Sequence, residues 1–292
     1  MRDLRVLGAY LGCCVMWALS WIFIKIGIRD FPPMLFAGIR CVLSAGVLFV
    51  YARLAGSPVR LRTVSHWSNF LVGLLFFGVP FIMIFVGEQT VDASVTAVVF
   101  ACSPTFSVTL AWIFLKERLS PPRALGVLLG LSGILYLYLP ALAASGFKAN
   151  EGLLMILLGA LSGSIGMIMA KTYLHQESPA TALPIQMILV APVILLASAL
   201  TESIDDARWT ASFALSLAYL AVFASGVAYA LYFWLLKRLP VAQLVYIDFI
   251  YPVLSIFFAR MVLGEPVSPR LAASTALIIF GGWLTSRSRP PA

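Results

Sequence analysis

Three ionisable side chains stand inside long apolar stretches of this sequence, and each is a candidate for function because a charge is costly in such surroundings. Lys25 falls near the end of the first stretch, Arg40 within the second and Asp248 within the ninth. The long lysine side chain can reach the membrane interface. Two interpretations stay open for Asp248. In the first, it has a structural role: it neutralises Arg40 or caps a helix end within the bundle. In the second, it has a functional role: it carries protons or binds a substrate amine.

Aromatic residues accompany these charges. Trp17, Trp21 and Lys25 follow each other every four residues, which places them on one face of a helix. A cavity lined by rings with few charges suits a substrate with an apolar or aromatic body and a zwitterionic head. Rings that face lipid or the membrane interface are the alternative. The candidate substrate-binding residues are Trp17, Ser20, Trp21, Tyr229, Tyr232, Tyr246 and Asp248.

Two prolines and two glutamates occupy matching places in the fourth and ninth stretches. Pro104 and Pro252 lie mid-stretch. Each removes a backbone donor and can kink a helix, so we expect them to act as hinges, with static helix shape as the alternative. Glu117 and Glu265 stand where the same stretches end, near water. For these glutamates we expect a structural role, such as bonding a neighbouring helix terminus.

The usual signatures of enzymes are absent from the sequence. It contains no His-Glu-x-x-His zinc pair, no Gly-x-Ser-x-Gly nucleophile elbow and no Gly-x-x-x-x-Gly-Lys phosphate loop. Its two histidines, His66 and His175, fall in expected loops. We therefore expect no enzyme activity, no metal site and no cofactor. The missing phosphate loop also argues against ATP as an energy source.

Membrane helices must position these residues. Of the 292 residues, 61% are hydrophobic and 11% are charged, whereas a soluble domain carries about 25% charged residues. The apolar runs reach the ~20 residues that cross a hydrocarbon core. The net charge of +8 comes from bases in short loops and not from one folded basic face, which argues against nucleic acid as a partner.

The expected fold is an all-α integral membrane protein with ten transmembrane helices. The first apolar span is too long for a signal-peptide core and lacks a small-residue cleavage site. With the N-terminus in the cytoplasm, about 13 bases fall inside and about 5 outside, so we expect both termini to be cytoplasmic. The expected spans are 6–28, 32–52, 68–87, 92–115, 121–139, 151–172, 180–201, 211–236, 241–263 and 268–286.

An internal repeat divides the chain. Pro104 and Pro252 are 148 residues apart (252 − 104 = 148), and so are Glu117 and Glu265 (265 − 117 = 148). At this offset about nine identities fall in some thirty ungapped positions, which is above chance even for shared membrane composition. Since each copy holds five spans, the second copy is inverted in the membrane. We expect one membrane domain, 1–292, made of two inverted five-helix repeats at 6–139 and 151–286.

The repeated stretches resemble the EamA repeat of the drug/metabolite transporter superfamily. The run Trp17-Ala18-Leu19-Ser20-Trp21 resembles the opening of that repeat, and Ser162-Gly163-Ser164-Ile165-Gly166 stands there in the second copy. The two halves are therefore expected to present different surfaces to a substrate. The further stretches that resemble the two copies of this repeat are 101–104, 115–120, 126–133, 250–252, 263–268 and 281–282. Its structural motif residues are Lys25, Arg40, Glu117 and Glu265.

The resemblance and the inverted repeat together imply a secondary transporter in the inner membrane of a prokaryote. It would export a small organic metabolite by alternating access around a midplane cavity. Its partners would be that small molecule, the lipid bilayer and, under one coupling scheme, protons. Members of the family export amino acids, other metabolites or drugs, and relatives move nucleotide sugars.

Aromatic or hydrophobic amino acids are the substrate class that a ring-lined cavity suggests first. Multidrug, nucleotide-sugar or lipid transport on the same fold are alternatives, and an intramembrane enzyme is the alternative from another class. Gly126 and Gly130 are four residues apart, which suits packing within the chain or a homodimer face, so the sequence leaves the oligomeric state open.

Overall fold

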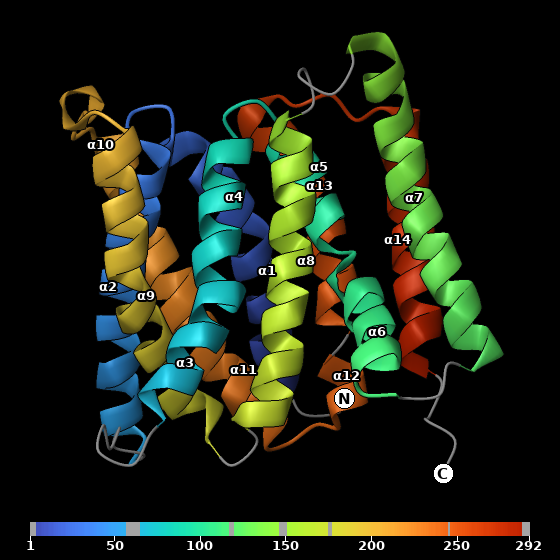
Figure 1. The fold of residues 1–292 in the computed structure, drawn as a ribbon, viewed down its shortest axis with the longest axis horizontal. Coiled ribbons are helices and arrows are strands. Elements are labelled where there is room, and N and C mark those ends of the chain that lie inside the picture. Colours follow the sequence, from blue (N-terminus) through green and yellow to red (C-terminus); the bar gives the residue numbers. More distant parts are fainter. Residues whose placement is uncertain are drawn as a thin grey trace.

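All regular structure in the described part of the chain is helical. The computed structural model describes residues 4–56, 65–116, 120–145, 151–174, 177–244 and 246–287, and no strand occurs within these ranges (Figure 1). Eight helical spans in these ranges are long and apolar enough to cross a membrane. The prediction of an all-α membrane protein is therefore confirmed.

The helical elements follow one another with short connections. The α-helices are α1 Leu4–Gly27, α2 Pro33–Leu54, α3 His66–Gly73, α4 Val79–Gly87, α5 Ala93–Phe100, α6 Ser103–Phe114, α7 Pro121–Ser145, α8 Glu151–Tyr173, α9 Pro179–Thr201, α10 Ala211–Ala218, α11 Ala228–Leu236, α12 Val241–Leu244, α13 Ile247–Leu263 and α14 Pro269–Arg287. A 3₁₀ turn, η4, spans Ile204–Asp206, and two π-helical segments are η2 Leu74–Gly78 and η5 Tyr219–Val227.

Several expected spans are interrupted helices. The segment η2 joins α3 to α4, and η5 joins α10 to α11, so each pair forms one span. A turn at Ala101 and Cys102 separates α5 from α6. The ninth expected span, 241–263, is divided into α12 and α13. Neither this span nor α14 is among the eight that qualify by length and composition.

Short sequence signals fix where many helices begin and end. Proline is tolerated in the first helical turn because the N–H that it lacks has no partner there. The hydroxyl of Thr210 accepts from the backbone N–H of Phe213 and so caps α10. After α13, Gly264 takes a left-handed conformation with φ of 73°, which ends the helix. Proline occupies the first residue of four helices at Pro33, Pro121, Pro179 and Pro269.

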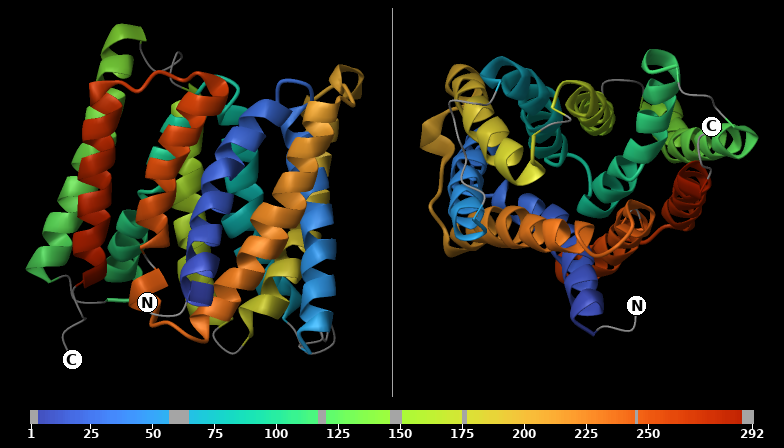
Figure 2. Two further views of the ribbon diagram at one scale, coloured as in Figure 1. Left: turned by 180° about the vertical axis from the view of Figure 1, so that it is seen from behind. Right: turned by 90° about the horizontal axis from the view of Figure 1, so that it is seen from below.

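Helices from the two halves of the chain pack in pairs. The helix α2 packs along α9, and α7 packs along α14 at one side of the bundle (Figures 1 and 2). The helix α1 contacts α11 and α13, while α8 contacts α4 and α6. The segment η5 contacts α2, and η2 contacts α9. Several contacts made by one half thus have a counterpart in the other.

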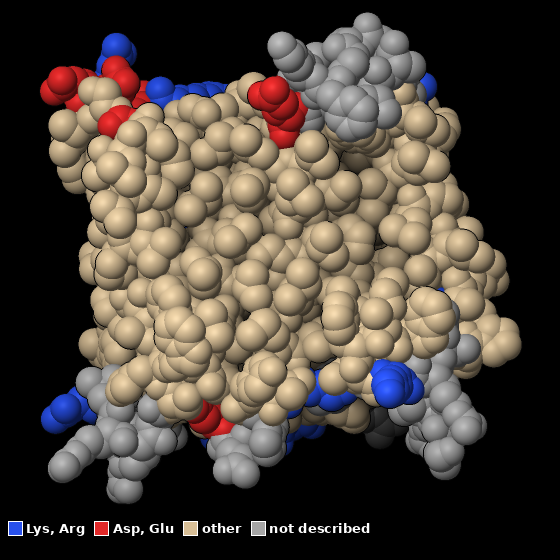
Figure 3. All heavy atoms as spheres, in the orientation of Figure 1, with Lys and Arg blue, Asp and Glu red and all other residues tan. Residues whose placement is uncertain are grey.

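Both ends of the described chain lie at the same end of the bundle. The helix α1 begins there and α14 ends there (Figures 1 and 2), and we call this the terminal end and its opposite the far end. On the face shown in Figure 3, Lys, Arg, Asp and Glu gather at the two ends and leave an uncharged band between them. Such a band matches the hydrocarbon layer of a membrane.

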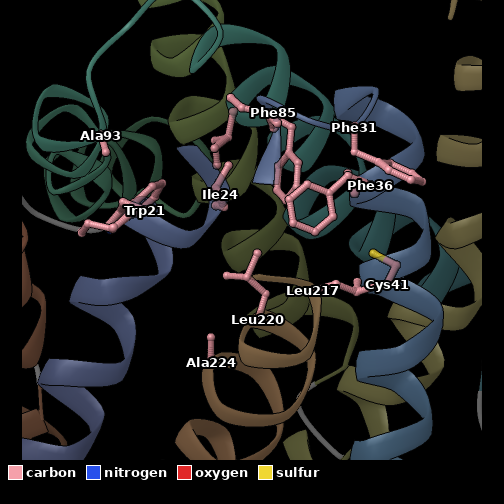
Figure 4. Close-up of a cluster of buried hydrophobic side chains, with 14 of the residues drawn as sticks. Trp21, Ile24, Phe31, Phe36, Cys41, Phe85, Ala93, Leu217, Leu220 and Ala224 are labelled. Atoms are coloured by element: carbon pink, nitrogen blue, oxygen red, sulfur yellow. The ribbon is translucent and has the colours of Figure 1, made fainter. Parts of the chain in front are cut away.

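The largest buried cluster brings together α1, α2, α4, α5, α9 and the α10–η5 segment (Figure 4). The ring of Phe36 packs against those of Phe85 and Phe213, in each case with centroids 5.1 Å apart. Phe31 stacks on Phe213 at 3.8 Å. Since α4 ends and α2, α5 and α10 begin at the far end, these rings pack that end of the molecule tightly.

Candidate functional site

The centre of α1 is joined to the π-helical segment η5. The backbone N–H of Ala228 donates to the carbonyl of Phe223, five residues back, as a π-helical turn requires. The carbonyl of Ala224 accepts a hydrogen bond of 3.1 Å from the indole N–H of Trp17. In the other direction, the Tyr219 hydroxyl donates to a backbone carbonyl of α1 at 3.1 Å. The π segment therefore fixes the orientation of Trp17.

Three of the predicted binding residues form one aromatic group. The ring of Trp17 lies 5.7 Å from that of Tyr229 and 5.5 Å from that of Tyr232, between centroids. The carboxylate of Asp248, at the start of α13, lies close enough to interact electrostatically with both tyrosines. We call Trp17, Tyr229, Tyr232 and Asp248 the inner group.

The oxygen atoms of the inner group have no partners in the described part of the chain. Neither tyrosine hydroxyl makes a hydrogen bond there, and the Asp248 carboxylate makes neither a hydrogen bond nor an ion pair, yet none of these oxygens is sealed from solvent. By contrast, the hydroxyl of Tyr10 donates to the Gln243 carbonyl at 3.0 Å. Buried polar groups are normally paired, so unpaired and accessible oxygens here can accept a ligand or water.

The remaining predicted binding residues lie apart from the inner group. Trp21 is buried against Phe100 and Tyr251, with centroid separations of 5.3 and 6.4 Å, and its indole N–H has no partner within the described ranges. Ser20 donates to a carbonyl of its own helix at 2.9 Å. Tyr246 packs against the neighbouring Phe249 ring. Trp17 and Trp21, which were predicted to share one face of a helix, therefore contact two separate sets of aromatic rings.

Arg40 and Asp248 do not form an ion pair, so this interpretation of the two buried charges is wrong. Arg40 is only 7% exposed, and its guanidinium lies 4.5 Å from the centroid of Phe81 and 5.8 Å from that of Phe85. Stacking on aromatic faces is a known environment for arginine. Among the described residues no carboxylate pairs with it.

Two other motif residues bind helix ends. The ammonium of Lys25 donates to the backbone carbonyls of Glu88 and Val91, the latter at 2.7 Å, just beyond the end of α4. The carboxylate of Glu265 accepts from the backbone N–H groups of Ala93 and Ser94 at 2.8 and 3.0 Å. A carboxylate at a helix N-terminus satisfies otherwise free donors of α5. Glu117 lies outside the described residues.

The hinge candidates occupy different local structures. Pro104 is the second residue of α6, directly after the turn that ends α5. Pro252 lies inside the continuous helix α13. A proline in the first turn of a helix costs little, whereas one inside a helix removes a hydrogen bond and bends it. The equivalent sequence positions therefore do not have equivalent helical surroundings, and a hinge role stays a prediction for both.

Sequence reasoning missed three acidic residues at the far end. Glu202 accepts from the backbone N–H groups of Met34 and Leu35 at 2.8 and 2.9 Å and so caps α2. Asp30 accepts from the hydroxyls of Thr210 and Ser212 at 2.6 and 2.7 Å. These hydrogen bonds hold the pKa of Asp30 below its ordinary value. Because Glu202 and Asp30 lie in expected loops between apolar stretches, the sequence alone suggested that both were solvent-exposed charges.

Glu88 is the third acidic residue that the sequence did not single out. Its side chain is fully buried, and neither carboxylate oxygen has a hydrogen-bond partner. Lys25, Arg40 and Glu265 carry the nearest charges. Its place directly after an apolar stretch suggested a position at the water interface. The fold buries it completely instead.

Comparison with known proteins gives one consistent picture. Residues 5–139 and 150–287 each match the EamA-like transporter family. The uncharacterized transporter YoaV of Bacillus subtilis is 24% identical over 278 residues, with 95% of each chain covered. The uncharacterized inner membrane transporter YedA of Escherichia coli is 27% identical over 282 residues, covering 95% of this chain and 89% of YedA.

A further relative carries a more specific name. A probable amino-acid metabolite efflux pump of Salmonella typhimurium is 27% identical over 281 residues, covering 91% of this chain and 90% of the pump. A solved crystal structure superposes with a TM-score of 0.69 at 19% identity and covers 98% of both chains. At that identity the superposition establishes a shared fold and nothing more.

Proposed function

Because this chain belongs to the EamA-like transporter family of the drug/metabolite transporter superfamily, we propose that it is a secondary transporter that exports a small organic metabolite by alternating access. The match of the family to both halves of the chain is the observation that carries this proposal. The relatives are named as transporters and not as enzymes. An intramembrane enzyme is therefore the less supported alternative.

The proposed topology has ten membrane spans in two inverted repeats. The eight qualifying spans are joined by a ninth made of α12 and α13 and a tenth made of α14. The π segments support the repeat, since Gly78 of η2 and Gly226 of η5 differ by the repeat offset (226 − 78 = 148). The reciprocal helix contacts support it as well. Inverted repeats of this kind are common in secondary transporters.

The proposed location is the inner membrane of a prokaryote, with both termini in the cytoplasm. YedA is named an inner membrane transporter. The excess of bases in the loops at the terminal end favours the cytoplasm for that end. The far end, with Asp30, Glu88 and Glu202, would then face outward.

Aromatic or hydrophobic amino acids are the proposed substrates. In the inner group, the rings of Trp17, Tyr229 and Tyr232 would pack against the substrate side chain, and Asp248 would bind its amine or carry a coupled proton. Ser20, Trp21 and Tyr246 would flank this site. One relative named as a probable amino-acid metabolite efflux pump supports the same class. Drugs, nucleotide sugars and lipids are the competing cargoes.

Counterflow into proteoliposomes tests this proposal. Vesicles with the purified chain and an excess of unlabelled phenylalanine inside should take up labelled phenylalanine, tryptophan and leucine transiently. The Trp17→Ala variant should lose this uptake, because it loses the ring at the centre of the inner group. The matched control is Trp67→Ala, at a side chain that is 68% exposed.

Each outcome has a direct meaning. Uptake that is lost in Trp17→Ala and kept in Trp67→Ala supports both transport and the site. No uptake of any amino acid, with uptake of a drug, a nucleotide sugar or a labelled lipid instead, contradicts the proposed substrate class. If Asp248→Asn removes only a pH-dependent part of the uptake, proton carriage rather than amine binding is its role.

A further inference from the structure

Arg40 is a buried cation without an anionic partner. Its side chain is 7% exposed, and its Nε atom is sealed from solvent with no acceptor. Its two terminal nitrogens donate to none of the described residues either, but they are not sealed. Removing a cation from water has a large free-energy cost unless a partner compensates. The rings of Phe81 and Phe85 compensate only in part, because a ring face cannot accept the planar fork of donors.

The nearest acid does not act as that partner. Glu88 is within electrostatic range of Arg40. Among the described residues, however, no group donates to its carboxylate oxygens at hydrogen-bond geometry, and the nearby Thr96 hydroxyl donates to the Asp92 carbonyl instead. Lys25, whose ammonium is also near Glu88, is occupied by two backbone carbonyls. The anion that Arg40 would pair with is therefore absent from the described chain. The two terminal nitrogens present the geometry that binds a carboxylate through two parallel hydrogen bonds.

Arg40 also borders the inner group. Tyr229 is within electrostatic range of both Arg40 and Asp248. Its hydroxyl is unpaired and accessible, so it can donate to an anion held by the guanidinium. A tyrosine hydroxyl can donate one hydrogen bond to a carboxylate that an arginine holds through two others. The same tyrosine ring packs against Trp17, so this charged site and the aromatic group are continuous.

We propose that Arg40, assisted by the hydroxyl of Tyr229, binds the carboxylate of the exported solute. This inference rests on the proposed function and adds a chemical requirement to it: the cargo carries a carboxylate. It also gives Arg40 a positive role in selecting cargo, in place of the structural role that its motif position suggested. Solutes of the same shape with a neutral amide in place of the carboxylate should be poor cargo.

A pair of ligands that differ only in this group tests the inference. Binding of labelled phenylalanine to the purified full chain is measured in competition with unlabelled phenylalanine and with phenylalaninamide. A charge-assisted pair of hydrogen bonds corresponds to roughly tenfold or greater preference for the acid. In Arg40→Gln this preference should fall to about one, because affinity for the acid drops to that for the amide, which is kept. Arg40→Lys should keep part of it.

The control is Arg53→Gln, on the same helix at an exposed position near the end of α2. It should keep the preference of the unaltered chain. If Arg40→Gln keeps the full preference, the inference is overturned. It is also overturned if Arg40→Gln weakens both ligands equally, since the arginine would then act only on the fold.

A second pair of ligands separates failure of this inference from failure of the proposed function. Thermal stabilisation by 3-phenylpropionate is compared with that by 3-phenylpropionamide, neither of which has an amine. If phenylalanine does not bind but the acid stabilises the chain through Arg40, the amino-acid proposal fails and the carboxylate site stands. If stabilisation by the acid is unchanged in Arg40→Gln, or absent from the unaltered chain, the carboxylate site is rejected.

Discussion

Buried and half-buried charged side chains in this protein fall into two sets with different consequences. One set is fully used by helix termini, as Lys25, Glu202 and Glu265 show. The other set, Arg40, Glu88 and Asp248, has no hydrogen-bond or ion-pair partner in the described chain. Because an unpaired buried group lowers stability, the second set is kept at a cost that a purely structural role does not explain.

Neutralising one glutamate from each set should therefore have opposite effects on stability. Glu265→Gln should lower the free energy of unfolding by about 1–3 kcal/mol, because the amide cannot accept all the hydrogen bonds that the carboxylate receives from Ala93 and Ser94. Glu88→Gln should leave stability unchanged or raise it. Thermal unfolding in detergent measures both. A larger loss for Glu88→Gln than for Glu265→Gln would contradict the distinction.

Residue types and spacing could identify part of the site. Trp17, Tyr229 and Tyr232 do come together, and aromatic residues beside an intramembrane acid are a signal that sequence carries. The separation of Arg40 from Asp248 could not be predicted, because it depends on which helices are neighbours. Glu88 was missed for the same reason, since its complete burial depends on which elements pack around the end of α4.

At the scale of elements, loops at the far end anchor the first turns of helices. Asp30 holds the N-cap residue Thr210 of α10, and its pKa is lowered mainly by the Thr210 hydroxyl and then by that of Ser212. Because the pKa of Asp30 is lower in the folded state than in the unfolded state, its ionised carboxylate stabilises the fold. This stabilisation is complete at pH values above the unfolded-state pKa, near 3.8, and is lost as the pH falls through the folded-state pKa.

Acid titration should reveal that contribution. Below about pH 4 the unaltered chain should lose thermal stability, and Asp30→Asn should be less stable at neutral pH and lose less on acidification. The control is Asp206→Asn, at an exposed position in the same region. Unfolding temperatures between pH 3 and 7 give the comparison. Identical profiles for Asp30→Asn and the unaltered chain would show that the cap contributes nothing.

Glycines set how closely helices of the two halves approach. A Cβ added at Gly281 of α14 would lie 2.6 Å from the carbonyl oxygen of Gly126 in α7, and backbone cannot move aside easily. Gly281→Ala should destabilise the chain by about 1–3 kcal/mol. In Gly46→Ala, where the added methyl meets open space within α2, stability should be unchanged or raised. Equal unfolding temperatures for both variants would rule out the close packing of α7 on α14.

Most elements could be predicted because membrane helices need runs of a fixed length. The runs at 6–28, 32–52 and 180–201 correspond to α1, α2 and α9 within a few residues. The π segments η2 and η5 could not be predicted, since an extra residue in a helical turn leaves hydropathy unchanged. The division between α12 and α13 was likewise hidden inside an apolar run.

At the scale of the whole molecule, the two ends differ in how they are joined. One large cluster of rings, with the caps from Glu202, Glu265 and Asp30, packs the far end (Figure 4). Toward the terminal end, the core is divided among smaller clusters. In a transporter that works by alternating access, a tightly packed far end together with a divided core toward the terminal end corresponds to the conformation in which the far end is closed. Transport would then require the far end to open.

The two prolines are the proposed hinges for that change. Pro104→Ala combined with Pro252→Ala should slow counterflow several-fold, because α6 and α13 would bend less easily at these points. Binding of phenylalanine should be retained, since neither proline belongs to the inner group. Initial rates in proteoliposomes and equilibrium binding in detergent are measured on the same preparation. Unchanged rates in the double variant would remove the hinge proposal and leave static helix shape as the role of both prolines.

Access to the inner group from both sides is the central claim, and cysteine labelling tests it most directly. The four native cysteines are completely buried, so the unaltered chain serves as the unlabelled control. In Tyr232→Cys, a membrane-impermeant thiol reagent should react when added to either side of oriented vesicles, and phenylalanine should slow the reaction from both. Labelling from one side only, or labelling that phenylalanine does not slow, would contradict a solute site reached alternately from the two faces of the membrane.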